Sequence, residues 1–242
     1  MAEGFADLHC HLLPGVDDGA KGTGDALEMA RTLVELGYSD VAPSPHARRE
    51  YAPRAACAQA LEQLREALAA ASIPLRLHVN AEHAFFEEGF LQEVTTGTVR
   101  RAGGGRCVLV EAPYTAPLPT LTDLVFRMKL KGCTPLIAHP ERCMEFERPG
   151  RALAAVEAGA LLQLDVGALI GRYGRTAQKL AREFLEQGLY AVAATDLHGP
   201  VGAREWVGRS LDELRKRAGD AGARKLLGEN PQRLLAGEAL DG

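Results

Sequence analysis

The sequence is short of the residues that mark several classes of protein. It contains 5 cysteines, 1 tryptophan and 5% aromatic residues in 242. The cysteines form no C-x-x-C pair, so we expect reduced thiols and no thiolate zinc site; they are Cys10, Cys57, Cys107, Cys133 and Cys143. None is followed six positions later by arginine, which excludes the phosphate loop of a cysteine-dependent phosphatase. A G-x-x-x-x-G-K-[ST] loop is also absent, which excludes nucleotide hydrolysis of the P-loop type.

Long hydrophobic runs are missing as well. No window approaches the 18 or so uninterrupted apolar residues that a membrane-spanning helix needs. The first residues, Met1 to Ala6, have neither the basic nor the apolar region of a secretory signal. From these absences we predict a soluble protein without a membrane span, located in the cytoplasm.

Neither sign of charge is in large excess. The 28 lysine and arginine residues against 32 aspartate and glutamate residues give a net charge of -4. Such a chain lacks the basic field that holds a phosphate backbone, so we expect no nucleic-acid partner. The composition, 46% hydrophobic and 25% charged, is that of a globular protein. With no linker or repeat, we predict a single domain over residues 1–242; the sequence does not specify an oligomeric state.

Short apolar runs alternate with amphipathic stretches along the whole chain. The expected strands are Phe5–His9, Val41–Ser44, Leu75–Ala81, Cys107–Ala112, Thr134–Ala138, Leu161–Val166 and Tyr190–Thr195. The expected helices are Thr23–Leu36, Pro53–Ala71, Thr120–Lys131, Arg148–Glu157, Thr176–Gln187, Arg204–Ala218 and Ala221–Leu227. Glycines stand where helices would end, at Gly37, Gly132, Gly159 and Gly188. The alternation predicts a parallel α/β fold, either an open doubly wound sheet or a closed barrel.

Residue types that bind metals recur where these strands end: His9, His11, His46, Glu82, Glu111, His139, Asp196 and His198. The carboxyl ends of parallel strands meet at one edge of a sheet or barrel, where active sites form. His9 and His11 are two positions apart, so both project to the same face of a strand. One histidine of this kind is more often structural, but chance would scatter the set over helices and surfaces. We therefore expect a single cluster.

The donor types predict several metal ions. Imidazole and carboxylate without thiolate suit Zn²⁺, Mn²⁺ or Fe. One ion uses about four protein ligands, and the set offers more than twice that number once Asp18 is included. The carboxylates of Asp18, Glu82, Glu111 and Asp196 could not all stay ionised in one small volume without cations. Three divalent ions would bring about +6 and leave about +2, which a phosphate dianion matches.

In this order, the motifs resemble the polymerase and histidinol phosphatase (PHP) superfamily. They are D-L-H-C-H (7–11), L-P-G-V-D-D-G (13–19), P-H (45–46), A-E (81–82), H-P-E-R (139–142) and D-L-H (196–198). More narrowly, they resemble its bacterial capsular and exopolysaccharide (CpsB-like) branch of protein-tyrosine phosphatases. The likeness spans essentially the whole chain and ends in E-N-P (229–231).

The resemblance implies a distorted (β/α)7 barrel of the TIM type with a trinuclear metal site at the carboxyl ends of its strands. It implies that the first ion is held by His9, His11, Glu82 and Asp196. Glu82 would bridge to a second ion bound by Glu111 and His139, and the third would be held by Asp18, His46 and His198. Three Mn²⁺ ions are favoured as cofactors, with Zn²⁺ or Fe as alternatives.

We also expect roles for residues that lie near the implied metal ligands. Arg142 and Arg204 would bind phosphoryl oxygens as charge accumulates on them. Asp7 would orient a metal ligand without binding metal. The part played by Asp17 stays open, and Asp165 either adds an acid to the cavity or accepts a hydrogen bond from a loop amide. The candidates for an aromatic rim around the substrate are Tyr51, Tyr114 and Tyr173.

The function implied is hydrolysis of phosphotyrosine by metal-activated hydroxide. The partner would be the phosphotyrosine-bearing tail of a bacterial tyrosine kinase that governs capsule or exopolysaccharide biosynthesis. Alternatives within the same chemistry are a small-molecule phosphatase of the histidinol-phosphate type and a nuclease. A further alternative is a binding module that keeps the fold without turnover, although no implied ligand is replaced by an apolar residue.

Overall fold

The computed structural model describes residues 4–240, so both ends of the predicted 1–242 domain lie outside the described range. Short strands alternate with helices along the chain. The strands are β1 (Phe5–Asp7), β2 (Tyr38–Val41), β3 (Arg76–Leu77), β4 (His83–Ala84), β5 (Cys107–Glu111), β6 (Thr134–Ala138), β7 (Leu161–Asp165) and β8 (Tyr190–Ala194). All pairs of neighbouring strands are parallel, in the orders β1-β2-β3 and β4-β5-β6-β7-β8.

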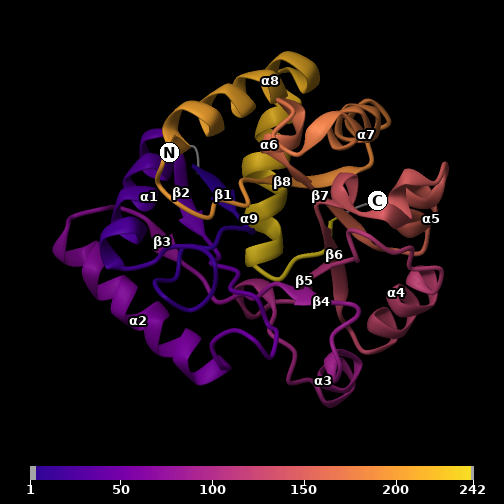
Figure 1. The fold of residues 1–242 in the computed structure, drawn as a ribbon, viewed down its shortest axis with the longest axis horizontal. Coiled ribbons are helices and arrows are strands. Elements are labelled where there is room, and N and C mark those ends of the chain that lie inside the picture. Colours follow the sequence, from indigo (N-terminus) through magenta and orange to yellow (C-terminus); the bar gives the residue numbers. More distant parts are fainter. Residues whose placement is uncertain (1–3, 241–242) are drawn as a thin grey trace.

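The helices lie mostly around the outside of the strands (Figure 1). They are α1 (Thr23–Glu35), α2 (Arg54–Ala70), α3 (Phe90–Thr96), α4 (Leu121–Leu130), α5 (Arg151–Glu157), α6 (Val166–Leu169), α7 (Gly174–Glu186), α8 (Ala203–Arg224) and α9 (Asn230–Leu235). Four shorter helical segments are η1 (Ala102–Gly104), η2 (Pro140–Arg142), η3 (Met144–Glu147) and η4 (Lys225–Glu229). Among residues 4–240, no helix combines the length and apolarity needed to cross a membrane.

Two isolated bridges connect the two sheets into a ring of strands. Cys10 pairs with Leu197 beyond the ends of β1 and β8, and His46 pairs with Glu82 between β2 and β4. The backbone N–H of Asp196 donates to the carbonyl of His9 (2.8 Å), and that of Ala47 donates to the carbonyl of Glu82 (2.7 Å). Both bridges therefore join segments that carry metal-type side chains.

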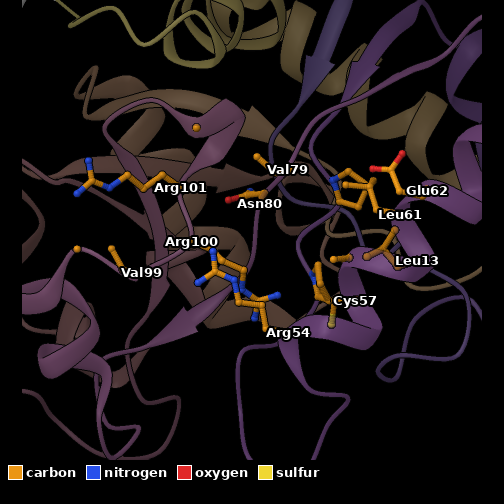
Figure 2. A pocket seen from close by; sticks show the side chains of 15 residues that line it. Leu13, Arg54, Cys57, Leu61, Glu62, Val79, Asn80, Val99, Arg100 and Arg101 are labelled. Atoms are coloured by element: carbon orange, nitrogen blue, oxygen red, sulfur yellow. The ribbon is translucent and has the colours of Figure 1, made fainter.

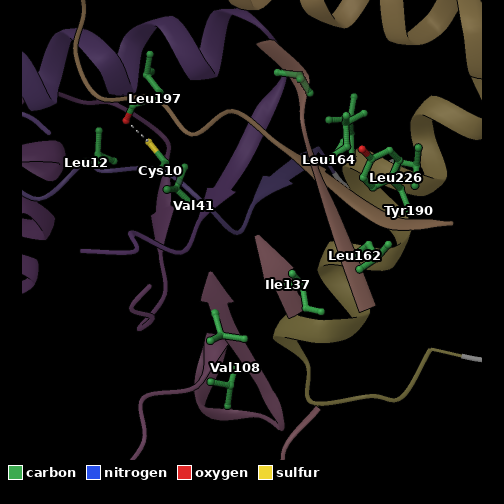
Figure 3. Close-up of a cluster of buried hydrophobic side chains, with 14 of the residues drawn as sticks. Cys10, Leu12, Val41, Val108, Ile137, Leu162, Leu164, Tyr190, Leu197 and Leu226 are labelled. Carbon is green, nitrogen blue, oxygen red and sulfur yellow. Dashed lines mark hydrogen bonds between the residues drawn. The ribbon is translucent and has the colours of Figure 1, made fainter. Parts of the chain in front are cut away.

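Two layers of apolar side chains fix the strands in place. The inner layer includes Ala6, Leu8, Ala42, Cys107, Leu109, Leu136, Ala138, Val192, Leu234 and Leu235. Helix α9, the yellow helix at the centre of Figure 1, supplies the last two and contacts β1 and β8. The outer layer lies between strands and helices, as Figure 3 shows, and includes Val108, Ile137, Leu162, Leu164 and Leu226. Alternate residues of β5 and β6 thus face opposite layers, as strand geometry requires.

This alternation delivers polar side chains to one end of the ring. In β5, Cys107 and Leu109 face the inner layer, so Glu111 continues on the same face at the carboxyl end. In β8, Val192 faces inward, and Asp196 follows four positions later. The inner face is therefore apolar at its amino end, where α9 packs, and polar at its carboxyl end.

The predicted parallel α/β class is confirmed, and the helix-ending glycines all have positive φ: Gly37 (98°), Gly132 (71°), Gly159 (96°) and Gly188 (69°). Two expectations on elements were wrong. The expected strand Leu75–Ala81 pairs only at Arg76–Leu77, and the next pairing, at His83–Ala84, belongs to the other sheet. The two helices expected between Arg204 and Leu227 instead form α8, with a kink at Gly219, followed by η4.

Candidate metal centre

All nine side chains expected to bind metal converge at the carboxyl ends of the strands. Their donor atoms fall into four groups, each within 4.8 Å. The groups are His9/His11/Asp196, His9/Glu82/His139, His46/Glu82/Glu111 and His11/Asp18/His46/His198. Shared members make the groups contiguous, so the nine residues form one cluster. Most of its side chains are buried; Asp18 (52% exposed) and His198 (36%) mark the side that faces solvent.

Glu82 lies at the middle of this cluster. Its Oε1 atom is 3.1 Å from His139 Nε2 and 3.4 Å from His9 Nε2, and its Oε2 atom is 2.8 Å from His46 Nδ1. One carboxylate thus faces three imidazoles contributed by different strand ends. A carboxylate whose two oxygens face different sets of donor atoms can bind two neighbouring ions.

The distances between donor atoms suit bound metal. Two atoms that bind one ion at about 2.1 Å lie about 3.0 Å apart in octahedral and about 3.4 Å apart in tetrahedral coordination. The Nε2 atom of His9 is 3.3 Å from that of His11 and 3.1 Å from Asp196 Oδ1, and His11 Nε2 is 3.4 Å from the same oxygen. Buried Asp196 Oδ1 also accepts no hydrogen bond from residues 4–240. The donor set therefore fits metal ions.

Outer contacts determine which imidazole nitrogens face the cluster. His9 Nδ1 lies 2.8 Å from Gln163 Oε1, and His11 Nδ1 lies 2.8 Å from Asp17 Oδ2. Each contact leaves the Nε2 atom facing the other donors, which is how residues around a metal site orient its histidines. The open question on Asp17 has a structural answer: its carboxylate contacts His11 and belongs to none of the four groups.

Asp7 and Asp165 also lie outside those groups. Asp7 accepts hydrogen bonds from the backbone N–H of His9 (3.0 Å) and from the Thr195 hydroxyl (2.6 Å), so it connects the ends of β1 and β8. Asp165 accepts from the Gly167 amide (2.9 Å), the loop contact that was one of its two expected roles. Both acids therefore shape the segments that carry the cluster.

The carboxylates of the cluster attract positive charge. Burial alone would lower the pKa of His9, but Asp196 and Glu82 outweigh burial and raise it to about 10. Burial likewise opposes protonation of His46, and Asp18 and Glu82 raise its pKa to about 9. At His139, by contrast, burial and the nearby Arg142 guanidinium lower the pKa to about 4. The same field that favours protons on two histidines would favour metal cations.

Unusual backbone conformations bring two members of the cluster into position. His139 follows β6 with φ 33°, and Asp196 follows β8 with φ 50°, although neither residue is glycine. Such values are uncommon outside glycine and concentrate at functional sites. Gly19, in the loop after His11, makes a close approach: a Cβ at Gly19 would collide with the carbonyl oxygen of His11.

Arg142 lies beside the cluster, as expected. Its Nη1 atom is 2.5 Å from Asp196 Oδ2 and 3.1 Å from Asp165 Oδ2. Its guanidinium carbon lies 4.1 Å from the centre of the Tyr173 ring and 5.0 Å from that of Tyr114. Two aromatic rings and two carboxylates thus hold a planar group of five N–H donors next to Asp196.

All three tyrosines that were candidates for an aromatic rim lie at the cluster. The Tyr51 ring stacks on His46 at a centroid distance of 5.0 Å. The Tyr114 hydroxyl is 3.3 Å from His139 Nε2, and Tyr173 contacts Arg142. Tyr51 and Tyr114 thus contact histidines of the cluster directly, whereas Tyr173 reaches it through Arg142 and lines the cavity that contains Asp196 and His198.

Arg204, which was expected to act with Arg142, lies elsewhere. Its Nη1 atom is 3.2 Å from Glu35 Oε2 of α1, and its side chain is 74% exposed. The reason is local: α8 begins at Ala203, just after Gly202 with φ 66°, and this start directs Arg204 towards α1. The structure therefore does not bring Arg204 to the cluster.

Two other arginines near the cluster were not anticipated. Arg48 contacts the carboxylate of Glu111, and Arg172 lines a cavity of about 530 Å³ together with Arg142, Asp196 and His198. Neither follows a strand directly, so the pattern of strand ends could not single them out. For Arg48 the available signal was a basic residue two positions after His46, which is a weak one; Arg172 lies near none of the motifs and had no such signal.

A second cavity, of about 510 Å³, is separate from the cluster (Figure 2). It lies between α2 and the segment from Gly97 to Gly104, and none of the nine residues lines it. Leu13 and Pro45 are among the residues that line it, so it borders the segments next to His11 and His46.

Comparison with known sequences identifies a family. The family described as "Capsular polysaccharide synthesis, CpsB/CapC" matches residues 5–236. Tyrosine-protein phosphatase YwqE of Bacillus subtilis is 32% identical over 195 residues, covering 79% of this chain and 76% of YwqE. Tyrosine-protein phosphatase CpsB of Streptococcus pneumoniae is 23% identical over 237 residues, covering 95% of this chain and 97% of CpsB.

Solved structures agree with the sequence comparison. A crystal structure from work on YwqE and CpsB, described as unique metal-dependent tyrosine phosphatases, superposes with a TM-score of 0.89 at 30% identity, covering 98% of this chain and 96% of that one. An organophosphorus hydrolase of Deinococcus radiodurans superposes with a TM-score of 0.59 at 15% identity, covering 96% and 92% of the two chains. The second likeness concerns the fold alone.

Proposed function

The chain belongs to the CpsB/CapC family of capsular polysaccharide synthesis proteins, and from this premise we propose that it is a metal-dependent tyrosine phosphatase acting on a phosphoprotein. Its relatives YwqE and CpsB are tyrosine-protein phosphatases, and the YwqE/CpsB structure is described as metal-dependent. The observation that carries the proposal is the convergence of nine imidazole and carboxylate side chains next to the Arg142 guanidinium.

We propose that these nine side chains hold three divalent ions. His9, His11 and Asp196 would share one ion with Glu82, and His139 and Glu111 would complete a second site on the other side of Glu82. The third would be held by Asp18, His46 and His198. The group His9/His11/Asp196 supports the first site, and the group His11/Asp18/His46/His198 supports the third. His139 and Glu111 belong to two different groups that share Glu82, so the second site rests on the central place of Glu82.

The donor types support the choice of metal. Nitrogen and oxygen donors without sulfur favour Mn²⁺, with Zn²⁺ or Fe as alternatives. When bound, such ions supply an activated water nucleophile at neutral pH and neutralise charge on the phosphoryl oxygens. The protein side chains would bind the phosphoryl group and the phenol ring and so position the substrate for hydrolysis.

Arg142 is the residue that we assign to the phosphoryl group. Its contacts with Asp165 and Asp196 and with the rings of Tyr114 and Tyr173 fix the plane of its guanidinium. A fixed fork of N–H donors can bind two phosphoryl oxygens at once and loses little freedom in doing so. Negative charge that accumulates on these oxygens during hydrolysis would strengthen the contact.

The rim of the site suits a phenyl ring. Tyr51 and Tyr114 stack on or touch imidazoles of the cluster, and Tyr114 is 41% exposed. Offset or edge contacts between aromatic rings favour a tyrosine side chain over an alkyl phosphate. A phenolate also leaves readily, because the pKa of tyrosine is about 10. We therefore assign no general acid.

The finer biological assignment is part of the proposal. The substrate would be the phosphotyrosine-bearing tail of a bacterial tyrosine kinase that governs capsule or exopolysaccharide assembly in the cytoplasm. The family name and the open side of the cluster at Asp18 and His198 support a protein substrate in capsule synthesis.

One comparison tests the proposed activity. A single metal-loaded preparation is given a phosphotyrosyl peptide, histidinol phosphate and single-stranded DNA at equal concentrations, and phosphate or nucleotide release is followed. We expect the peptide to be hydrolysed with the highest kcat/KM. Faster turnover of histidinol phosphate or DNA would assign the site to the alternative chemistry, and no turnover of any of the three would contradict hydrolysis altogether.

A further inference from the structure

Arg172 is held over an aromatic ring at the edge of the cavity that contains Arg142. Its guanidinium carbon lies 4.1 Å from the centre of the Trp206 ring. The stem of Arg172 passes over Gly167, where a Cβ would lie only 2.9 Å from Arg172 Cδ. Gly167 makes room for the side chain of Arg172, and the Trp206 indole stacks on the face of its guanidinium. Together they orient this arginine, and stacking leaves the N–H groups at the edge of the guanidinium free to donate hydrogen bonds.

In the part of the chain that the structure describes, no carboxylate contacts that edge. Within residues 4–240, the guanidinium of Arg172 has no aspartate or glutamate oxygen within 4.0 Å, whereas Arg142 has two. The side chain is exposed, so an anion from outside can reach it. A planar donor group that is oriented but has no acidic partner is suited to bind an oxyanion.

The surroundings of Arg172 are those of a peptide site. The cavity is also lined by Lys21 and Asp25, by the half-buried Trp206 and by Val201, which is 94% exposed. Its volume of about 530 Å³ exceeds what a phosphate group alone would fill. Asp196 and His198 of the cluster are also among the residues that line it. A chain whose phosphotyrosine enters the cluster would place a neighbouring residue in this cavity.

We propose that Arg172 and Trp206 form a second anion subsite, which binds an acidic side chain adjacent to the phosphotyrosine of the substrate. This inference rests on the proposed phosphatase function and adds a sequence preference to it. Arg142 binds the phosphoryl group, and Arg172 binds the carboxylate of the neighbour. Lys21 and Asp25, which also line the cavity, carry opposite charges, so the site depends on Arg172. Arg204, paired with Glu35, takes no part.

The kinetic test compares two phosphotyrosyl peptides that differ only in the residues on either side of the phosphotyrosine, glutamate in one and glutamine in the other. 4-Nitrophenyl phosphate reports on the phosphoryl site alone. The variants are Arg172→Gln, Arg204→Gln and, as a matched control, Arg175→Gln, an exposed arginine in the first turn of α7 that does not line the cavity.

We expect the wild type to have a KM about fivefold to tenfold lower for the glutamate peptide than for the glutamine peptide, the range of a charge-assisted contact at a partly exposed site. Arg172→Gln should lose this preference through KM, with kcat retained, while Arg204→Gln and Arg175→Gln keep it. An Arg172→Glu variant should prefer a peptide with lysine at the same positions. A preference that survives in Arg172→Gln overturns the proposal, as does an equal loss on 4-nitrophenyl phosphate, which would assign Arg172 to the phosphoryl group.

Trp206 provides a readout of binding that is independent of turnover, because it is the only tryptophan in the sequence. A peptide that carries a phosphonomethyl group in place of the phosphate cannot be hydrolysed. Its glutamate form should change the tryptophan fluorescence at lower concentration than its glutamine form, and Arg172→Gln should remove that difference. Equal titration curves for both forms on the wild type would contradict the subsite even if the phosphatase activity is established.

Discussion

Nδ1 of His11 lies 2.8 Å from Oδ2 of Asp17, and this contact turns Nε2 of the same ring towards Glu82 and Asp196. Asp17 also accepts hydrogen bonds from the backbone N–H of Gly19 (3.0 Å) and of His46 (3.2 Å). One buried carboxylate thus orients an imidazole and joins the loop after β1 to the segment after β2. Mutation of side chains that orient metal ligands in this way typically weakens metal affinity or activity about 10-fold to 100-fold.

Asp17→Asn should therefore weaken metal binding about 10-fold to 100-fold without unfolding the protein. The amide keeps the size of the carboxylate but loses the charge that orients His11. Metal content after dialysis against graded chelator, measured by elemental analysis, gives the affinity. Asp220→Asn, on the exposed side of α8, is the control; equal metal retention in both variants would show that Asp17 does not support the site.

Arg142→Lys should lower kcat/KM on 4-nitrophenyl phosphate by about 10²–10³. Lysine keeps the positive charge beside Asp165 and Asp196 but loses the planar fork that can bind two phosphoryl oxygens. Steady-state kinetics on metal-saturated protein checks this, with the thermal unfolding temperature as evidence of an intact fold. Activity within about threefold of wild type would remove Arg142 from the phosphoryl site.

Gly19→Ala and Gly24→Ala should have opposite effects. A Cβ at Gly19 meets the carbonyl oxygen of His11, so the loop must shift and the cluster must lose its geometry. At Gly24, within α1, nothing lies within 4 Å of the added carbon, and alanine should stabilise the helix by up to about 1 kcal/mol. Denaturant unfolding and metal content measure the two effects. A Gly19→Ala protein that retains full metal content would contradict the tight approach.

Asp40 should make stability depend on pH far from the metal cluster. Burial alone would raise its pKa, but hydrogen bonds from His78, Arg76, Ser39 and Gln232 outweigh burial and hold the pKa well below its usual range. A depressed pKa in the folded state stabilises the protein above the unfolded value of about 4 and loses this contribution as pH falls.

Asp40→Asn should accordingly be less stable than wild type by about 1–2 kcal/mol at pH 7, and the gap should narrow below about pH 4. Urea unfolding of both proteins between pH 3 and pH 7 gives the difference at each pH. A gap that stays constant over this range would mean that the Asp40 carboxylate is not stabilised in its ionised form.

Removal of metal should change stability as well as activity. A ligand that binds only the folded state stabilises it by mass action, so chelation should lower the unfolding temperature and the return of Mn²⁺, Zn²⁺ or Fe²⁺ should restore it. Glu82→Gln, which alters the centre of the cluster, should unfold at nearly the same temperature with and without metal. Wild-type protein that is indifferent to chelator in the same assay would contradict a resident ion.

The class of fold and the membership of the cluster could be predicted from the sequence because both depend on short-range rules. Parallel strands bring their carboxyl ends together whatever the helices do, so residues such as Glu82 and His139 had to meet once the alternation was recognised. Glu111 shows the rule within one strand, since it shares the inner face with Leu109.

Contacts that depend on tertiary geometry were not predictable in this way. Arg204 begins a helix, and its direction is set by the conformation of Gly202 and by Glu35 across the interface with α1. Arg172 occupies a turn between α6 and α7, and its guanidinium stacks on Trp206 from α8, a contact between segments far apart in the sequence. The segment from Leu75 to Ala81 reads as one strand, but the ring of strands divides there and only two of its residues pair. No local pattern encodes such long-range choices.

Helix α9 packs Leu234 and Leu235 against the inner layer at the amino ends of the strands, although it follows all eight of them in the chain. Synthesis runs from the amino end, so the centre of the molecule stays open to water until residue 235 has left the ribosome. Nascent chains that end before α9 should expose Leu8, Leu109 and Leu136 and be recognised by chaperones. A fusion that holds residues 230–235 away from the strands would leave the same gap in the finished protein.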